Sequence, residues 1–313
     1  MTKVFDQAHG DWFAAYRCDA VEFAATLPDN SVDFSIYSPP FASLYIYSQS
    51  ERDMGNVGSE QEFAEQYRPL VSALYQATKP GRLTAVHCSD LPRTKSTHGY
   101  IDLYDFPADI RKVHEEAGWT YHSRITVWKD PVVEMQRTKA LGLLYKQLQK
   151  DATRSRQGMP DYVLVFRKTP ESEDKAVPVG QDANTFPVAQ WQQWASPVWM
   201  DIDQTDVLNV RAARDAGDEK HVCPLQLDLI ERAIRLWSNP GDVVFSPFMG
   251  IGSEGFAAIK AGRHFLGTEL KDSYFRQAAK YLGEAEAERG NLFAAPASPQ
   301  PGADVSHLME GLE

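Results

Sequence analysis

Apolar runs and amphipathic segments alternate along most of this chain. Continuous or alternating apolar runs of four to eight residues are typical of strands, and apolar residues that recur every three or four positions are typical of helices. Segments with strand character lie at 14–17, 32–37, 83–88, 121–128, 162–166, 243–245 and 264–267. Segments with helix character lie at 20–27, 60–78, 106–117, 224–236, 253–261 and 271–282. Strands spaced by helices predict an α/β fold, with a mostly parallel sheet covered by helices on both faces.

Two stretches depart from this alternation. Residues 169–190 are rich in Pro, Glu, Asp and Gln, which predicts a loop or linker. The residues from 289 onward are rich in Ala, Pro and Ser, which predicts a disordered tail. Within the segment 60–78, Pro69 is expected to kink or restart the helix, since proline removes a backbone donor.

Composition restricts the class of protein and its compartment. No apolar run approaches the ~20 residues of a membrane span, and the first residues contain no apolar signal core, so we expect a cytoplasmic protein without a membrane partner. The three cysteines are far apart, so they predict neither a disulfide framework nor a metal knuckle. The histidines show no metal-ligand spacing, so no metal site is expected.

Charge is unevenly distributed. The net charge of −11 argues against a polyanionic partner, because nucleic-acid binding depends on Lys and Arg. However, residues 284–313 contain six acidic residues and one base, whereas residues 129–156 contain seven bases and three acidic residues. This asymmetry is compatible with one basic face on an acidic body, and a merely solvated helix face is the alternative.

A strand–loop–helix–strand unit near the C-terminus has the layout of a nucleoside site. Gly250 and Gly252 lie in the loop, Ser253 opens the helix, and Glu269 lies at the end of the next strand. Glycines let the backbone approach a ligand, and the acid can bind ribose hydroxyls. The loop lacks the G-K-[ST] ending of a triphosphate site. A plain tight turn is the alternative.

A second unit is Ser-Pro-Pro-Phe at residues 38–41, directly after the candidate buried strand 32–37. Ligands of open α/β sheets bind at the carboxyl ends of strands. Two prolines fix the backbone and remove two donors, so Ser38 Oγ and the Pro39 carbonyl are available as acceptors beside the flat ring of Phe41. Such a site suits the amino group of a planar base. A simple Pro-Pro turn is the alternative.

Together these stretches resemble an S-adenosylmethionine-dependent DNA amino-methyltransferase. Residues 38–41 match the catalytic loop [DNS]-P-P-[YFW] of that family, and residues 246–253 match its cofactor loop D-P-F-x-G-x-G-[ST]. Ser246 stands where an Asp is usual. Residues 18–33 resemble the stretch that leads into the catalytic loop, and residues 221–226 loosely resemble the start of the helix before the cofactor loop. The catalytic loop comes first, which is the order of the family's β group.

The resemblance covers residues 14–128 and 220–282 and implies a Rossmann-like fold that binds S-adenosylmethionine. It implies a methyltransferase domain from residues 1–128 and 206–288, an inserted recognition region at 129–205 and a tail at 289–313. By the same resemblance, the catalytic residues are Ser38, Pro39, Pro40 and Phe41. The implied cofactor-binding residues are Asp19, Ser246, Pro247, Phe248, Gly250, Gly252, Ser253 and Glu269.

The implied activity is methyl transfer to a flipped-out base of double-stranded DNA, as in restriction–modification. Ser-Pro-Pro favours N4 of cytosine over N6 of adenine by family analogy. An RNA amino-methyltransferase and, because of Ser246, a catalytically impaired DNA-binding protein are the alternatives. The basic segment is the expected DNA-facing element. Its candidate contacts are Lys129, Arg137, Lys139, Arg154 and Arg156. A monomer and a homodimer both stay open.

Overall fold

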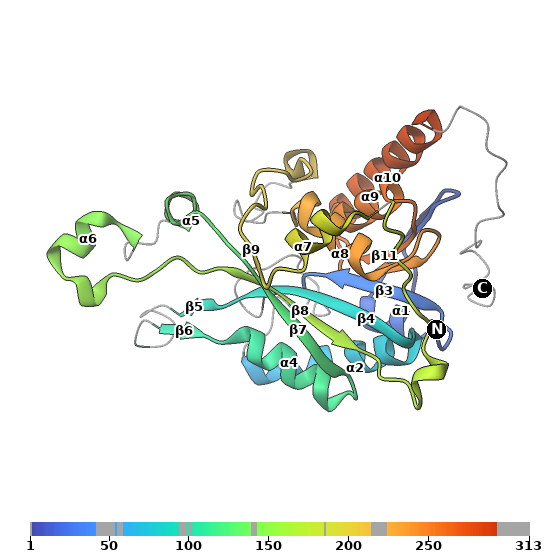
Figure 1. The fold of residues 1–313 in the computed structure, drawn as a ribbon, viewed down its shortest axis with the longest axis horizontal. Coiled ribbons are helices and arrows are strands. Elements are labelled where there is room, and N and C mark those ends of the chain that lie inside the picture. The colour runs from blue at the N-terminus through green and yellow to red at the C-terminus, as the bar shows by residue number, and fades with distance from the viewer. Residues whose placement is uncertain are drawn as a thin grey trace.

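The fold is centred on a nine-stranded sheet (Figure 1). This computed structural model describes residues 2–41, 54, 59–93, 99, 102–138, 143–184, 186–213 and 224–292. The strand order is β1-β2-β11-β10-β3-β4-β8-β7-β9. The strands are β1 Asp6–His9, β2 Phe13–Arg17, β3 Val32–Tyr37, β4 Thr78–Ser89, β7 Thr120–Val127, β8 Asp161–Arg167, β9 Val198–Trp199, β10 Val243–Ser246 and β11 His264–Glu269. A separate two-stranded hairpin joins β5 Leu91–Arg93 to β6 Asp102–Tyr104.

The centre of the sheet is parallel. Strands β2, β11, β10, β3 and β4 are adjacent and parallel to one another. Strand β8 runs antiparallel to both β4 and β7, and β1 runs antiparallel to β2. The late strands β10 and β11 therefore lie between the early strands β2 and β3. This arrangement confirms the expected mostly parallel α/β sheet.

Helices cover both faces of this sheet. The helices are α1 Ala20–Ala24, α2 Glu60–Ala77, α4 Phe106–Glu116, α5 Pro131–Thr138, α6 Tyr145–Lys150, α7 Val188–Trp194, α8 Leu227–Trp237, α9 Ser253–Lys260 and α10 Asp272–Leu292. On one face, α1, α2 and α4 pack in a cluster that includes Phe23, Phe63 and Phe106. On the other face, α8, α9 and α10 pack in a cluster that includes Ile230 and Phe275.

Strand β3 contributes side chains to both clusters, and its pairing with β4 has a register irregularity between Val32 and Phe34. Phe34 and Ile36 belong to the cluster under α8, α9 and α10, whereas Val32 and Tyr37 belong to the cluster under α1, α2 and α4. All six residues of the strand are buried. The strand is covered on both sides, as a central parallel strand usually is, and its polar residues Asp33 and Ser35 are buried with the others.

Several predicted boundaries are wrong for identifiable reasons. Helix α2 continues through Pro69 as far as Ala77, and β4 begins at the next residue. Helix α10 continues beyond the predicted end at 282, because Ala285 packs in the core and Glu286 Oε1 accepts the Trp12 amide hydrogen at 2.7 Å. The predicted tail therefore begins with helical residues at 289–292, and its remainder lies outside the described residues.

Helix α9 has no space for a side chain at Gly255. A Cβ atom there would lie 2.3 Å from Leu282 Cδ2 and 2.5 Å from the Phe265 ring. We expect Gly255→Val to lower the free energy of unfolding by about 1–3 kcal/mol through overpacking, measured by urea denaturation. Gly283→Ala in α10 is the control, since its Cβ would meet no atom within 4 Å. That change is expected to stabilise the helix by about 0.5–1 kcal/mol, and equal effects of the two changes would contradict the packing argument.

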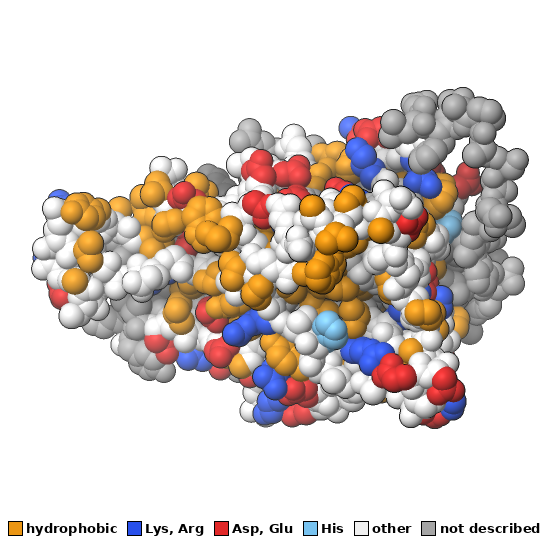
Figure 2. All heavy atoms as spheres, viewed as in Figure 1, with side chains coloured by type: hydrophobic (Ala, Val, Ile, Leu, Met, Phe, Trp, Pro, Cys, Tyr) orange, Lys and Arg blue, Asp and Glu red, His pale blue; other side chains and the backbone are white. Residues whose placement is uncertain are grey.

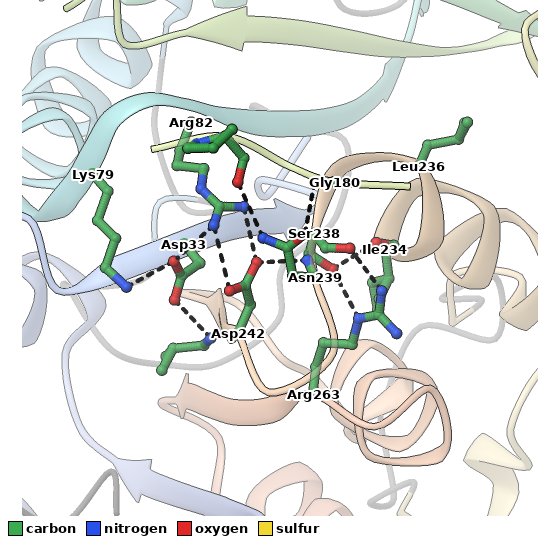
Figure 3. Close-up of polar contacts among 12 residues, drawn as sticks. Asp33, Lys79, Arg82, Gly180, Ile234, Leu236, Ser238, Asn239, Asp242 and Arg263 are labelled. Atoms are coloured by element: carbon green, nitrogen blue, oxygen red, sulfur yellow. Dashed lines mark hydrogen bonds and ion pairs between the residues drawn. The ribbon is translucent and has the colours of Figure 1, made fainter. Parts of the chain in front are cut away.

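A charged network lies at the amino ends of the central strands (Figure 3). Arg82 Nη1 lies 2.8 Å from Asp242 Oδ2, and Arg82 Nη2 lies 3.3 Å from Asp33 Oδ1. Lys79 Nζ approaches the same Asp33 oxygen at 2.7 Å. The backbone amide of Val243 donates to Asp33 Oδ2 at 3.0 Å. The network joins β3, β4 and β10 at the base of the sheet.

Candidate active site

A cavity of about 500 Å³ opens at the carboxyl ends of the central strands. Phe41, from the loop after β3, and Gly250, from the loop after β10, both line it. They meet there because β3 and β10 are parallel neighbours, with Val244 paired to Phe34. The two motif loops, far apart in the sequence, therefore face one space.

Most of the predicted site residues line this cavity. They are Asp19, Ser38, Pro39, Pro40, Phe41, Pro247, Phe248, Gly250, Ser253 and Glu269. Ser246 and Gly252 do not line it. Ser246 is fully buried at the end of β10, and Gly252 is the residue that precedes α9. Both lie behind the cavity wall and shape the loop between them.

The proline loop holds an aromatic ring at the cavity. Pro39 is buried and Phe41 is half-buried. The Phe41 ring meets Phe106 edge-on, with ring centroids 5.9 Å apart and planes at 88°. Its centroid also lies 6.4 Å from the His87 ring. These contacts fix the ring in one orientation, from which it can stack on a planar ligand.

The glycine loop adopts a conformation that few other residues accept. Gly250 has φ +54° and Gly252 has φ +91°. A Cβ at Gly252 would also lie 3.2 Å from Ala278 Cβ on α10. The loop closes through the Gly252 amide, which donates to the Met249 carbonyl at 2.7 Å. Glycine is therefore required at Gly252 by both the backbone and the packing.

The cavity wall near this loop offers polar atoms to a ligand. Ser253 Oγ and Gln226 Oε1 are buried atoms of cavity-lining residues, and they have no hydrogen-bond partner within the described ranges. Buried polar atoms are usually satisfied, so such atoms point to a missing ligand. The Asp19 carboxylate, which also lines the cavity, caps α1 by accepting from the Glu22 amide at 2.9 Å. Glu269 Oε1 accepts from the Lys271 amide at 2.7 Å, which orients this carboxylate at the end of β11. The orphaned oxygens and the glycine loop together fit a polar nucleoside ligand.

Sequence reasoning missed Glu254, the second residue of α9. Its side chain is only 4% exposed, and it lines the cavity. Burial, together with the negative charge of Glu269, raises the pKa of Glu254 to about 8. An acid directly after a Gly-x-Gly-Ser loop was the available signal, but the helical pattern alone assigns such a residue no role.

Sequence reasoning also missed the partners of Ser38. Its Oγ lies 2.8 Å from His87 Nδ1, and His87 Nε2 lies 3.1 Å from Asp161 Oδ2. Lys129 Nζ contacts the same Asp161 oxygen at 2.5 Å. All four residues line the cavity. Neither His87 nor Asp161 belongs to a motif identified from the sequence.

The candidate DNA contacts have unequal environments. Lys129 contacts the buried Asp161, and Arg156 Nη2 lies 3.5 Å from the buried carboxylate of Glu134. Arg154 is exposed. The side chain of Arg137 and all of Lys139 lie outside the described part of the chain. The DNA-facing role of these five residues stays a prediction. Two of them, Lys129 and Arg156, form ion pairs within the protein.

The segment that contains α5 and α6 projects from the sheet beside the hairpin β5–β6 (Figure 1). Hydrophobic side chains gather over it in Figure 2. They include Val132, Val133, Tyr145 and Leu148, which are 57%, 45%, 72% and 46% exposed. Helix α6 buries no side chain. Leu148, the leucine of this helix, is therefore exposed and faces no core.

The described ranges contain neither a group of side chains placed to hold a metal ion nor a helix able to cross a membrane. No cluster of three or more His, Cys, Asp or Glu side chains there is placed to hold a metal ion. No helix in those ranges has the length and apolarity needed to cross a membrane. Cys18 and Cys88 are buried free thiols, and burial raises the pKa of both. Neither thiol therefore has the character of a nucleophile.

Comparison with known proteins identifies relatives over most of the chain. A family model described as DNA methylase matches residues 32–280. The type II methyltransferase M.BglII of Bacillus subtilis is 23% identical over 292 residues, which cover 88% of this chain and 71% of that protein. The type II methyltransferase M.MjaI of Methanocaldococcus jannaschii is 21% identical over 273 residues, covering 79% of this chain and 84% of that protein.

Among solved structures, the cytosine-N4-specific PvuII DNA methyltransferase has a TM-score of 0.62 and 16% identity. The match covers 98% of this chain and 94% of that one. A DNA modification methylase of Thermus thermophilus, solved with S-adenosyl-L-methionine, has a TM-score of 0.61 and 21% identity. It covers 86% of this chain and 93% of that one. At these identities the two structures establish a shared fold.

Proposed function

The chain belongs to the DNA methylase family, and on this basis we propose that it methylates an exocyclic amino group of a base in double-stranded DNA. We infer that the methyl donor is S-adenosylmethionine and that the target is N4 of cytosine. The observation that carries this proposal is the shared cavity, in which the proline loop after β3 faces the glycine loop after β10.

The residues of the cavity fit such a donor. The glycine loop and Ser253 can receive its polar groups, and Glu269, at the end of β11, is placed to bind ribose hydroxyls. Asp19 lies on the same wall, after β2. When bound, S-adenosylmethionine supplies a methyl group activated by a positively charged sulfur. The Thermus thermophilus methylase, which shares this fold, was solved in complex with the same donor, and this supports the assignment.

The proline loop can hold and activate an amino group. The lone pair of a base amine is delocalised into its ring, so the amine attacks poorly. Ser38 Oγ and the Pro39 carbonyl can accept its two N–H bonds, which favours a pyramidal nitrogen with its lone pair aimed at the methyl group. Phe41 can stack on the base. The base must leave the duplex, since its amino group is otherwise paired.

Cytosine is favoured over adenine by two observations. The first residue of the proline loop is Ser38, and Ser-Pro-Pro resembles the N4-cytosine members of the family. The PvuII enzyme, which shares the fold across 98% of this chain, is cytosine-N4-specific by name. The related type II methyltransferases further support a role in restriction–modification, acting on host DNA in the cytoplasm.

One experiment tests donor, polymer and base together. The purified protein is incubated with S-adenosylmethionine and duplex DNA, single-stranded DNA or RNA, and the digested nucleosides are analysed by mass spectrometry. We expect N4-methylcytosine in duplex DNA. N6-methyladenine would overturn the cytosine assignment, and methylation of RNA alone would overturn the DNA assignment. No methylation of any polymer, with the donor still bound in calorimetry, would contradict the transferase proposal.

We expect Phe41→Ala to reduce turnover by about 10- to 100-fold while leaving the Kd for S-adenosylmethionine unchanged. Loss of a stacking platform costs about 1–3 kcal/mol per base, and the ring contacts of Phe41 are with Phe106 and His87, away from the glycine loop. Turnover is measured on duplex DNA and Kd by calorimetry. Phe41→Tyr, which keeps a flat ring, is the matched control. An equal loss of turnover and cofactor affinity would contradict the stacking role.

A further inference from the structure

A line of four side chains leads from the cavity into the protein. Ser38 follows β3, His87 lies in β4, Asp161 opens β8 and Lys129 follows β7. The sheet aligns them because Asp161 is paired with Ser89 on one side and with Val127 on the other. Strand β8 is hydrogen-bonded to both β4 and β7. The spacing of the line is therefore set by the sheet and not by flexible loops.

The charges along this line define its hydrogen-bond direction. Burial opposes ionisation of Asp161, but the charge of Lys129 holds the pKa of Asp161 well below its usual range. An ionised carboxylate can only accept hydrogen bonds. Within the relay, a neutral His87 ring carries its proton on Nε2, which lies 3.1 Å from Asp161 Oδ2, and Nδ1 is then an acceptor. The Ser38 hydroxyl, 2.8 Å away, then donates to Nδ1 and keeps its lone pairs for the cavity.

We propose that Ser38 and His87 form a proton relay for the methylated amine, with Asp161 and Lys129 as positioning residues that fix the His87 tautomer. This inference rests on the proposed amino-methyltransferase function and names the group that accepts the departing proton. Ser38 touches the substrate, whereas His87 acts through Ser38. The proline loop by itself supplies only hydrogen-bond acceptors for the amine, and the relay adds a group that takes up its proton.

The step balances in atoms and electrons. The amine lone pair forms the new C–N bond while the bond between sulfur and the methyl carbon breaks, and its electron pair stays on sulfur. As positive charge develops on the nitrogen, one of its protons passes to Ser38 Oγ. The hydroxyl proton of Ser38 passes to His87 Nδ1, and the resulting imidazolium is paired with the Asp161 carboxylate. Water takes up this proton after product release.

The same line of side chains resembles the Ser-His-Asp arrangement of hydrolases, but the backbone disfavours a nucleophilic Ser38. In such enzymes, backbone N–H groups next to the serine stabilise the negative oxygen of the intermediate. Here the two residues after Ser38 are Pro39 and Pro40, which have no N–H. The serine therefore has acceptors around it where a hydrolase needs donors, and a proton relay is the chemistry that remains.

The tautomer of His87 tests the relay without any turnover. Long-range ¹H–¹⁵N NMR of the wild-type protein, with His87→Asn used to assign the signals, is expected to show His87 protonated at Nε2 and unprotonated at Nδ1. Asp161→Asn is expected to shift this tautomer balance, because the neutral amide can also donate. A wild-type His87 protonated at Nδ1 would overturn the relay, since Ser38 could not then donate to it.

Kinetic measurements provide the second test of the relay. Under single-turnover conditions with saturating S-adenosylmethionine and duplex DNA, His87→Asn is expected to slow methyl transfer by about 100-fold, the scale of general base catalysis. Asp161→Asn is expected to give a smaller loss. The KM for DNA and the Kd for the cofactor should stay within about twofold. His122→Asn is the control, because His122 lies on the exposed part of β7 and contacts Ser123.

The outcomes separate this inference from the proposed function. Unchanged methyl transfer in His87→Asn would overturn the relay and leave the transferase proposal intact. A parallel loss of rate and cofactor affinity in the same variant would also overturn it, since it would indicate a structural role. If the wild-type protein methylates nothing, the proposed function fails, and the NMR result still decides the geometry of the relay.

Discussion

Replacing Arg82 with methionine is expected to lower the free energy of unfolding by about 3–5 kcal/mol, the cost of removing one partner from a buried ion pair. The Arg82 side chain is 2% exposed and separates two carboxylates, Asp33 and Asp242. Methionine keeps most of the volume but leaves these acids without their shared cation. Urea denaturation followed by circular dichroism measures the change.

The pH dependence of this loss has a definite sign. Burial, and then the charge of Asp33, already raises the pKa of Asp242. Without Arg82, the pKa of Asp242 should rise further. As the pH falls, Asp242 then becomes protonated in the folded state, which removes its repulsion with Asp33. The deficit should therefore be smaller at pH 5 than at pH 8. Arg235→Met is the control, since Arg235 forms a surface pair with Glu231 and should cost less than about 1 kcal/mol. A deficit that grows towards pH 5 would contradict this account.

The second large effect is expected at Glu254, where Gln should stabilise the free protein at alkaline pH by a few kcal/mol. The pKa of Glu254 is about 8 in the folded protein against an ordinary value of 4.5, and each unit corresponds to about 1.4 kcal/mol. The raised value means that the folded state holds its proton more tightly than the unfolded state. Wild-type stability therefore falls as the pH rises from about 4.5 to about 8 and is constant above that range.

Urea denaturation at pH 5, 7 and 9 measures this difference. Glu254→Gln should lack the decline, so its advantage should be small at pH 5 and largest at pH 9. Glu65→Gln, on the exposed face of α2, is the control and should match the wild type throughout. Saturating S-adenosylmethionine should reduce the advantage, because a cation near Glu254 favours its ionised form. An advantage of equal size at all three pH values would contradict the buried, protonated carboxyl.

The motif loops could be predicted from sequence because each follows directly from a local pattern. Residues 32–37 form a strand-like segment that ends at Ser38, and the structure places β3 over the same residues. The glycine loop likewise follows a short apolar strand and opens a helix at Ser253. A strand end followed by proline or glycine is a local signal, so it needs no knowledge of which strands become neighbours.

The line from Ser38 to Lys129 could not be predicted because it depends on strand neighbours. His87, Asp161 and Lys129 come from three separate elements, and only the order β4-β8-β7 brings them together. From sequence, the positive charge of Lys129 was assigned to DNA, since no local pattern places Asp161 beside it. The end of α10 was underestimated for a similar reason, because its contact with Trp12 lies at the other end of the chain.

The placement of β10 and β11 between β2 and β3 has a consequence for biosynthesis. Until the ribosome has made residues near 269, a nascent chain holds β2 and β3 with open hydrogen-bonding edges where β11 and β10 belong. Open edges of buried strands promote association between chains, and pairing over such a long separation is slow. Truncation before β10 is therefore expected to leave these edges open and to yield insoluble material.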